Sequence, residues 1–438
     1  MKLSRYTHLF NDGEHYYMFN AETIFISEID KDLFFCLHDR DFDRIPESTA
    51  ARLMEKRIIV DDSSRDLYFL NSKTQSLRKS YDTRTLSLII APTTGCNFAC
   101  PYCFEPKKNP KTMTREVEDR IIEYVRSRTL AENISLTWYG GEPLLAFDII
   151  ERLYDRIIAE TEKKIISHGI ITNGFLIDNL VISFFKKSGL DNIQISFDGT
   201  KDRHDRSRFL KDGNRPTFDI IRANLEKLAA DIPDLKIQAR INVNRNNIGD
   251  FAEMFKLFSD PFRFKNVHVY PGIIREESAD GVSMCGRCYS ERDLPELYEL
   301  IEKEGIPVNY LPRIPGKGCM AHSADAFIIG PEGELYKCWE DVSKPNRVVG
   351  SIMDGKRGDY GLMMRYMHDC DVFDDKCRKC RVFPICWGGC AYRRYRNMFE
   401  EGEFEICSPL RNPELLKRVM LDFIRSGRPE SEKFVSMF

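Results

Sequence analysis

The chain has 438 residues, of which 42% are hydrophobic and 30% charged, and its formal net charge is −3. This balance is ordinary for a globular protein and excludes a general attraction to nucleic acid or to anionic lipid. No stretch is apolar enough for a membrane span or a signal peptide, so we expect a cytoplasmic protein with neither. The length predicts about two to four domains. The 14 cysteines of such a protein indicate metal binding or catalysis before disulfides.

Residues 1–85 are expected to form a small N-terminal domain. Two half-apolar runs within residues 6–20 flank Asn11-Asp-Gly, which is a hairpin signal. Helical patterns cover residues 24–37 and 48–56, and strand patterns cover residues 58–60 and 67–70. This order is typical of a winged-helix-like fold, and it also fits a cap that only packs against the next domain.

From residue 86 onward, strand patterns alternate with amphipathic helical patterns. The predicted strands are residues 86–93, 134–139, 168–172, 192–197, 237–243 and 267–270. The predicted helices are residues 114–127, 147–163, 178–187, 218–230 and 250–258. Repeated βα units of this length predict a parallel α/β barrel over residues 86–310, in which functional groups gather at the carboxyl ends of the strands.

Three cysteines follow the first of these strands. Cys96, Cys100 and Cys103 have the spacing C-x3-C-x2-C. Four thiolates would complete a structural zinc site or an iron–sulfur cluster, whereas three leave one iron of a cubane without a protein ligand. An open metal position is where chemistry can occur. The alternative is a zinc loop whose fourth ligand lies elsewhere in the chain.

The triad resembles the signature of radical S-adenosylmethionine (SAM) enzymes, whose fold is a partial, six-stranded barrel. In these enzymes the open iron of a 4Fe–4S cluster chelates SAM, and an electron from the cluster cleaves SAM to a 5′-deoxyadenosyl radical. Tyr102 matches the aromatic residue that precedes the third cysteine, which implies a contact with the adenine. Residues 140–143, Gly-Gly-Glu-Pro, resemble the family motif that lines the SAM amino group.

Polar residues also follow the later strands. The run 196–199, Ser-Phe-Asp-Gly, is followed by His204 and Arg208 and resembles a family motif that hydrogen-bonds the ribose or the amino-acid part of SAM. His204 equally fits a surface histidine. Arg240 is expected inside the barrel, where it needs an anionic partner, either a protein carboxylate or that of SAM. The resemblance implies these SAM contacts: Tyr102, Gly140, Gly141, Glu142, Pro143, Asn173, Ser196, Asp198, Arg208 and Arg240.

A second group of cysteines lies near the C-terminus. Its members are Cys319, Cys338, Cys377, Cys380, Cys386, Cys390 and Cys407. A zinc ribbon would explain Cys377 and Cys380 taken alone. The order and spacing of all seven match the SPASM extension of radical SAM proteins. That extension implies two auxiliary 4Fe–4S clusters and therefore three clusters in all.

The resemblance also implies how these cysteines are shared. The distal cluster would be held by Cys377, Cys380, Cys386 and Cys407. The cluster nearer the active site would be held by Cys319, Cys338 and Cys390. The resemblance does not identify a fourth ligand for the nearer cluster. Its fourth iron can lack a protein ligand, or it can be bound by His322, Asp325, Cys285, Cys288 or Cys370. The SPASM domain is expected over residues 311–438.

The resemblance implies a peptide maturase that installs a crosslink in a ribosomally made precursor peptide, a thioether first and a carbon–carbon or carbon–oxygen link second. The N-terminal domain would bind the leader of that peptide, and a flavodoxin- or ferredoxin-type protein would supply electrons. The enzymatic alternative is a sulfatase maturase that makes formylglycine. Those relatives place an aspartate directly after the second SPASM cysteine, whereas Trp339 follows Cys338 here. A non-catalytic iron–sulfur electron carrier is the alternative of another class.

Overall fold

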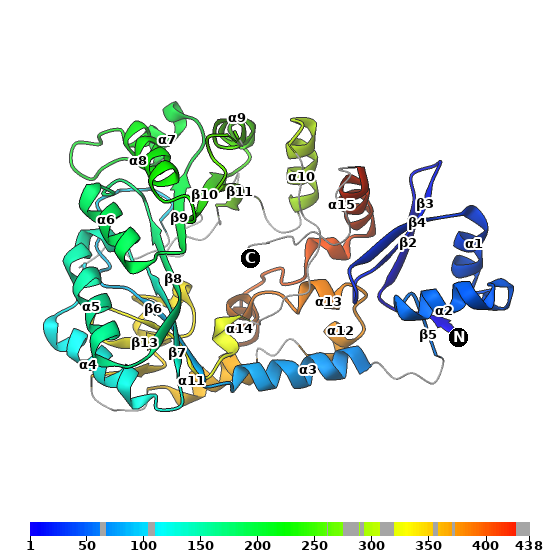
Figure 1. Ribbon diagram of the computed structural model, residues 1–438, viewed down its shortest axis with the longest axis horizontal. Coiled ribbons are helices and arrows are strands. Elements are labelled where there is room, and N and C mark those ends of the chain that lie inside the picture. The colour runs from blue at the N-terminus through cyan, green and yellow to red at the C-terminus, as the bar shows by residue number, and fades with distance from the viewer. Residues whose placement is uncertain are drawn as a thin grey trace. The chain divides into compact units, whose positions relative to one another are not determined.

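The computed structural model describes residues 1–61, 67–103, 110–260, 262–274, 289, 293–306, 319–353, 358–369 and 373–425. Its described residues fall into two compact units, and Figure 1 labels most of their elements. One unit comprises Tyr81–Ser290 and Met320–Asp369, and the other comprises Met1–Ser80, Glu291–Cys319 and Cys370–Phe438. Within the described ranges, no helix is both long and apolar enough to cross a membrane.

Six parallel strands form the main sheet, in the order β11–β10–β9–β8–β7–β6. They are β6 (Thr85–Ile90), β7 (Asn133–Trp138), β8 (Lys164–Thr172), β9 (Asn192–Phe197), β10 (Lys236–Val243) and β11 (Val267–Ile273). The connecting helices are α4 (Arg115–Ser127), α5 (Phe147–Glu160), α6 (Asn179–Ser188), α7 (Lys201–Ser207), α8 (Phe218–Asp231) and α9 (Ile248–Phe258). All predicted strands and helices of this region are confirmed, and α7 is an addition that the sequence pattern does not indicate.

The two faces of this sheet differ in polarity. Every second residue of β7 and of β9 is buried, which is the pattern of a strand with one apolar face. Helices α4, α5 and α6 lie along one side of the sheet in Figure 1. On the face opposite the buried residues, Ser196, Arg240 and Tyr270 are register neighbours on β9, β10 and β11. A parallel sheet is usually apolar on both faces, so this polar face is a feature that packing alone does not explain.

Three further strands extend the same sheet beyond β6. Strand β12 (Ala326–Ile329) pairs in parallel with β6, and β13 (Glu334–Tyr336) and β14 (Gly350–Ser351) follow in antiparallel order. Helix α11 (Tyr360–Met364) belongs to the same unit. Cys338 therefore follows the end of a strand that is continuous with the main sheet.

The other unit contains an antiparallel sheet near the N-terminus. Its strands are β2 (Thr7–Asn11), β3 (Tyr16–Asn20) and β4 (Phe25–Ile29), with a second pair formed by β1 (Lys2–Leu3) and β5 (Ile59–Val60). Its helices are α1 (Lys31–Asp39), α2 (Glu47–Glu55), α3 (Leu67–Ser80) and α10 (Leu294–Lys303). Two expectations are wrong here. Residues 24–37 begin as a strand, because β4 pairs with β3, and residues 67–70 begin a helix, because Phe69 and Ser72 are buried at helical spacing.

The N-terminal sheet shares its core with the C-terminal segment of the same unit. Tyr6, Phe10 and Phe19 pack in one apolar cluster with Phe383 and Met420. The C-terminal elements are α12 (Asp375–Arg378), α13 (Phe383–Cys386), α14 (Ala391–Phe399) and α15 (Pro413–Arg425). Removing residues 1–80 would therefore expose the apolar core that supports the C-terminal cysteines.

Candidate active site

The cysteine triad lies in the loop after β6, at the carboxyl edge of the main sheet. Backbone hydrogen bonds join residues 97–99 of this loop to residues 209–211. Cys96, Cys100 and Cys103 are free thiols. Burial raises the pKa of Cys96 to about 12 and also raises the pKa of Cys100. Both thiols are therefore protonated in the bare protein, and a bound metal must displace their protons.

Two glycines bring the end of β7 against the backbone that precedes the triad. Gly140 has a φ of 125°, and a Cβ atom there would lie 2.2 Å from the carbonyl oxygen of Thr93. A Cβ atom on Gly141 would lie 2.4 Å from the carbonyl oxygen of Gly95. Both positions need glycine because backbone packs against backbone beside Cys96. The next motif residues continue into the short 3-10 helix η2 (Pro143–Ala146), whose proline is buried.

Glu142 holds the ends of two strands to the triad loop. It is 0% exposed, and its carboxylate accepts hydrogen bonds from Thr172 Oγ1 and from the Asn173 backbone N–H, each at 2.7 Å. The Leu144 N–H donates to it as well, at 3.0 Å. Its own N–H donates to the carbonyl oxygen of Gly95 at 2.8 Å. Burial raises the pKa of this carboxyl, and the bonds from its donors oppose that rise.

A polar network joins Tyr102 of the triad loop to the carboxyl ends of β9 and β10. The Tyr102 hydroxyl donates to Asp198 Oδ1 at 2.7 Å and accepts from Arg208 Nη1 at 3.0 Å. Asn242 Nδ2 donates to the same Asp198 oxygen at 2.9 Å. Asp198 and Arg208 are buried and lie 3.9 Å apart. The hydroxyl of Tyr102 therefore anchors the loop within the protein.

His204 is 0% exposed, so the surface alternative is wrong. Its Nδ1 accepts a bond from the Asp198 N–H at 3.4 Å, and its Nε2 lies 3.1 Å from Thr217 Oγ1. The Thr217 hydroxyl donates to the carbonyl oxygen of Arg208 at 2.5 Å, so it must accept from the histidine. Burial lowers the pKa of His204 to about 3, which keeps the ring neutral. This histidine supports the backbone of Asp198.

Arg240 lies on the polar face of the sheet, beside Ser196. A Cβ atom on Gly272 would fall 2.1 Å from Arg240 Nε, so the glycine makes room for the arginine. Among the described residues, Arg240 Nε is buried without a hydrogen-bond partner. Of the two partners left open for Arg240, a protein carboxylate is not found at this nitrogen among the described residues. A buried guanidinium nitrogen with no partner among the described residues fits an anionic group from outside the described protein.

Two residues that the sequence analysis did not single out belong to this site. Asn242 joins the Tyr102 network and lies two positions after Arg240, on the same face of β10. That two-residue spacing was a signal that could have found it. Asn97 Oδ1 accepts from Asn173 Nδ2 at 2.7 Å, which ties the loop after β8 to the triad loop. Nothing in the sequence pattern indicates this contact.

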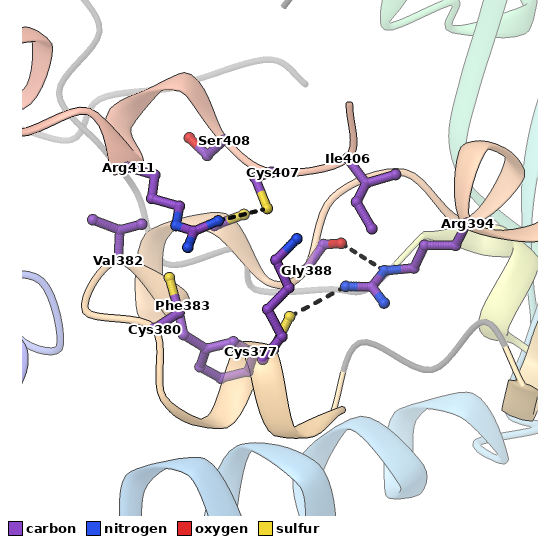
Figure 2. Close-up of a pocket in the computed structure, with 12 residues that line it drawn as sticks. Cys377, Cys380, Val382, Phe383, Gly388, Arg394, Ile406, Cys407, Ser408 and Arg411 are labelled. Atoms are coloured by element: carbon purple, nitrogen blue, oxygen red, sulfur yellow. Dashed lines mark hydrogen bonds between the residues drawn. The ribbon is translucent and has the colours of Figure 1, made fainter. Parts of the chain in front are cut away.

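A second cysteine site lies in the unit that contains the C-terminal segment. Cys377, Cys380, Cys386 and Cys407 line one pocket, shown in Figure 2. In the described part of the chain, no three histidine, cysteine or carboxylate side chains converge as the ligands of a single metal ion do. In a 4Fe–4S cluster each cysteine binds a different iron, so its thiolates lie further apart. Four cysteines lining one pocket are the ligand number of a 4Fe–4S cluster.

A tight turn brings the last cysteine of this pocket to the others. Trp387, Gly388 and Gly389 have φ values of 49°, 77° and 80°. A Cβ atom on Gly389 would lie 2.0 Å from the carbonyl oxygen of Ile406, so the chain before Cys407 packs directly on the turn. This close approach explains how a residue far along the sequence completes the pocket.

The remaining cysteines are not gathered in one unit. Cys319 and Cys390 belong to the unit with the N-terminal sheet, and Cys338 belongs to the unit with the main sheet. Their sharing of one cluster stays a prediction. Of the alternative fourth ligands, Asp325 lies 3.7 Å from Arg128, and burial raises the pKa of its carboxyl. Cys285, Cys288 and Cys370 lie outside the described residues.

Residues 90–258 match the radical SAM superfamily, and this segment contains the triad, the Gly-Gly-Glu-Pro run and the Tyr102 network. The chain carries a radical SAM domain. The expectation of a radical SAM enzyme is thereby confirmed, and the alternative of a non-catalytic electron carrier is wrong. Such a domain implies one 4Fe–4S cluster and SAM. The triad at the strand ends fits the cluster, and Arg240 Nε, which has no hydrogen-bond partner among the described residues, fits SAM.

The relatives of this radical SAM enzyme include maturases. The cysteine-type anaerobic sulfatase-maturating enzyme of Clostridium perfringens (strain 13 / Type A) is 24% identical over 351 residues, which cover 73% of this chain and 92% of the relative. The PqqA peptide cyclase of Granulibacter bethesdensis is 23% identical over 341 residues, covering 74% and 86% of the two chains.

Solved structures with the same fold span most of the chain. Native anSMEcpe with bound AdoMet superposes with a TM-score of 0.61 at 21% identity, covering 78% of this chain and 98% of that one. Streptococcus suis SuiB bound to the precursor peptide SuiA superposes with a TM-score of 0.53 at 15% identity, covering 93% of this chain and 97% of that one.

Proposed function

We propose that this radical SAM enzyme installs an intramolecular crosslink in a ribosomally made precursor peptide, a thioether first and a carbon–carbon or carbon–oxygen link second. The observation that carries the proposal is the four-cysteine pocket outside the radical SAM domain. Cleavage of SAM needs one cluster only, so a second cysteine site implies further electron transfer. The peptide cyclase among the relatives supports a peptide substrate.

The cofactors of the proposal are SAM and three 4Fe–4S clusters, with the cysteines divided as the resemblance implies. The triad cluster and SAM supply the radical that removes a hydrogen atom from a substrate carbon. The protein positions these groups. Glu142 and Tyr102 hold the triad loop through the hydrogen bonds described above. Arg240 is our candidate for the SAM carboxylate, since a guanidinium binds a carboxylate well and its Nε has no partner in the described residues.

We further infer that the N-terminal sheet region binds the leader of the precursor, and that a flavodoxin- or ferredoxin-type protein delivers electrons. Helix α1 presents Phe35, which is 42% exposed and contacts the ring of Tyr16. Phe35→Ser should weaken leader-peptide binding measured by calorimetry. Ile158→Ser removes a similarly exposed residue of α5, outside the N-terminal domain, and serves as the control. If both variants bind the leader peptide with the affinity of the wild type, α1 is not part of the leader-binding site.

Formylglycine formation is the second candidate, because a sulfatase-maturating enzyme is among the relatives. Formylglycine formation needs a base. The nearest buried acidic residue after Cys338 is Asp341, which comes three residues later rather than directly after the cysteine. Asp341 is 0% exposed and accepts a bond from the Tyr366 hydroxyl at 2.7 Å. Burial raises the pKa of this carboxyl to about 6. Its enclosure favours a structural role over contact with a substrate.

One experiment separates these activities. The reconstituted protein is incubated without oxygen with SAM, dithionite and either a precursor peptide encoded beside its gene or a cysteine-containing sulfatase peptide. Crosslinking removes two hydrogens and keeps the sulfur, whereas formylglycine formation from cysteine loses the sulfur and leaves an aldehyde. Mass spectrometry with hydrazine labelling distinguishes the products. Release of 5′-deoxyadenosine with conversion of the sulfatase peptide alone would overturn the crosslinking proposal.

A further inference from the structure

Two arginines donate hydrogen bonds to thiols of the four-cysteine pocket. Arg394 Nη2 lies 3.2 Å from Cys377 Sγ, and Arg411 Nη1 lies 3.5 Å from Cys407 Sγ. Figure 2 shows the two guanidinium groups reaching these sulfurs from different segments, α14 and the turn before α15. Neither arginine belongs to the cysteine pattern that predicts the pocket.

The Arg394 guanidinium is fixed in place on all sides. Its residue is 6% exposed, its Nε donates to the carbonyl oxygen of Gly388 at 2.8 Å, and its Nη1 donates to Asp374 Oδ2 at 2.9 Å. Asp374 also accepts from the backbone N–H of Cys377 at 2.6 Å, as the N-cap of α12. The charge and the thiol that it contacts are thus held by the same carboxylate. A buried cation is costly unless it is paired in this way.

Cation contacts of this kind act on a redox site through electrostatics. A cluster bound by four thiolates carries a net negative charge, which increases when it accepts an electron. A guanidinium and its N–H donors at the thiolate sulfurs stabilise the more negative, reduced form more than the oxidised form. Hydrogen bonds to cluster sulfurs and the local charge are among the features that set reduction potentials.

We propose that Arg394 and Arg411 raise the reduction potential of the cluster at Cys377, Cys380, Cys386 and Cys407, so that this site accepts the electron released by substrate oxidation. One electron enters from the substrate side and one leaves to the flavodoxin- or ferredoxin-type partner, with no bond made or broken at the arginines. The inference rests on the proposed function, because it takes this pocket to hold a 4Fe–4S cluster. The arginines are positioning residues for its charge.

The test is a redox titration of the reconstituted full-length chain, followed by electron paramagnetic resonance. The signal of this cluster is the one that disappears in Cys380→Ala. Arg394→Gln should lower the reduction equilibrium constant by about tenfold, which is about 59 mV for one electron. Arg411→Gln should shift it in the same direction by less, since Arg411 is exposed and solvent screens its charge. Arg394→Lys should give an intermediate shift, because it keeps the charge and loses the planar fork.

Arg396→Gln is the matched control. Arg396 lies on the same helix as Arg394, but it bonds to the Tyr392 hydroxyl at 3.1 Å and to Glu400 at 2.9 Å. Its replacement should leave the potential unchanged. Potentials in Arg394→Gln and Arg411→Gln that equal the control would overturn the inference. If Arg394→Gln loses the cluster, an unshifted Arg411→Gln overturns it equally. Full iron content in Cys380→Ala, which offers no donor atom, would instead contradict the cluster assignment itself, and so the proposed function.

Discussion

Replacing Gly141 with alanine should displace the triad loop. The added Cβ atom would lie 2.4 Å from the carbonyl oxygen of Gly95 and 2.5 Å from that of Thr94. Both contacts are with backbone, so no flexible side chain can move aside. Gly95 is bonded directly to Cys96, and the loop can relieve the overlap only by moving the first ligand of the triad.

The size of the effect follows from two contacts. Overpacking of this kind costs about 1–3 kcal/mol. The same shift strains the 2.8 Å hydrogen bond from the Glu142 N–H to the carbonyl oxygen of Gly95. A hydrogen bond of that type contributes about 0.5–1.5 kcal/mol. The expected loss of unfolding free energy is therefore about 1.5–4.5 kcal/mol, the sum of the two ranges.

Iron content, 5′-deoxyadenosine release and denaturant unfolding measure this prediction. Gly141→Ala should lose the iron of one cluster and most SAM cleavage while keeping the iron of the C-terminal pocket. Gly249→Ala is the control, because a Cβ atom at Gly249 meets nothing within 4 Å. That glycine lies in α9, where alanine is favoured by about 1 kcal/mol. If both variants keep full iron and activity, the reasoning from backbone contact is refuted.

Three further predictions concern the same sheet. Changing Cys96, Cys100 and Cys103 to alanine should abolish SAM cleavage, and iron analysis should still find the iron of the C-terminal cysteines; residual 5′-deoxyadenosine would contradict the triad assignment. Tyr102→Phe keeps the ring and removes the hydroxyl, so the unfolding free energy should fall by about 1–3 kcal/mol. An unchanged unfolding free energy would contradict a stabilising role of the Tyr102 network. Burial lowers the pKa of His168 to about 4, so the unfolded chain binds the extra proton between pH 4 and its ordinary pKa of 6.5. The unfolding free energy of the wild type should thus fall as the pH drops below 6.5. Between pH 7 and pH 5, His168→Gln should lose about 2 kcal/mol less unfolding free energy than the wild type, measured by chemical unfolding. Parallel plots of unfolding free energy against pH for the two proteins would contradict this.

Local signals in the sequence determined the order of strands and helices in the main sheet. The two-residue period of segments such as 192–197 and the helical period between them depend on neighbours along the chain, so the pattern records them directly. The spacing of Cys96, Cys100 and Cys103 is also local, and it was enough to indicate the triad. The same reasoning failed at residues 67–70, where a short apolar run has no period of its own. In the structure these residues begin α3, and the helix places Phe69 in the apolar core of its unit.

The tertiary structure alone decided which distant side chains meet. Asn242 reaches Tyr102 across 140 positions of sequence, and Arg394 and Arg411 reach the thiols of Cys377 and Cys407. No periodicity encodes such contacts, because they depend on how separate elements pack and on where a buried charge finds its partner. The sequence by itself therefore determined the type of chemistry through its ligands. The side chains that position those ligands, and the arginines that contact their sulfurs, could be identified only from the folded structure.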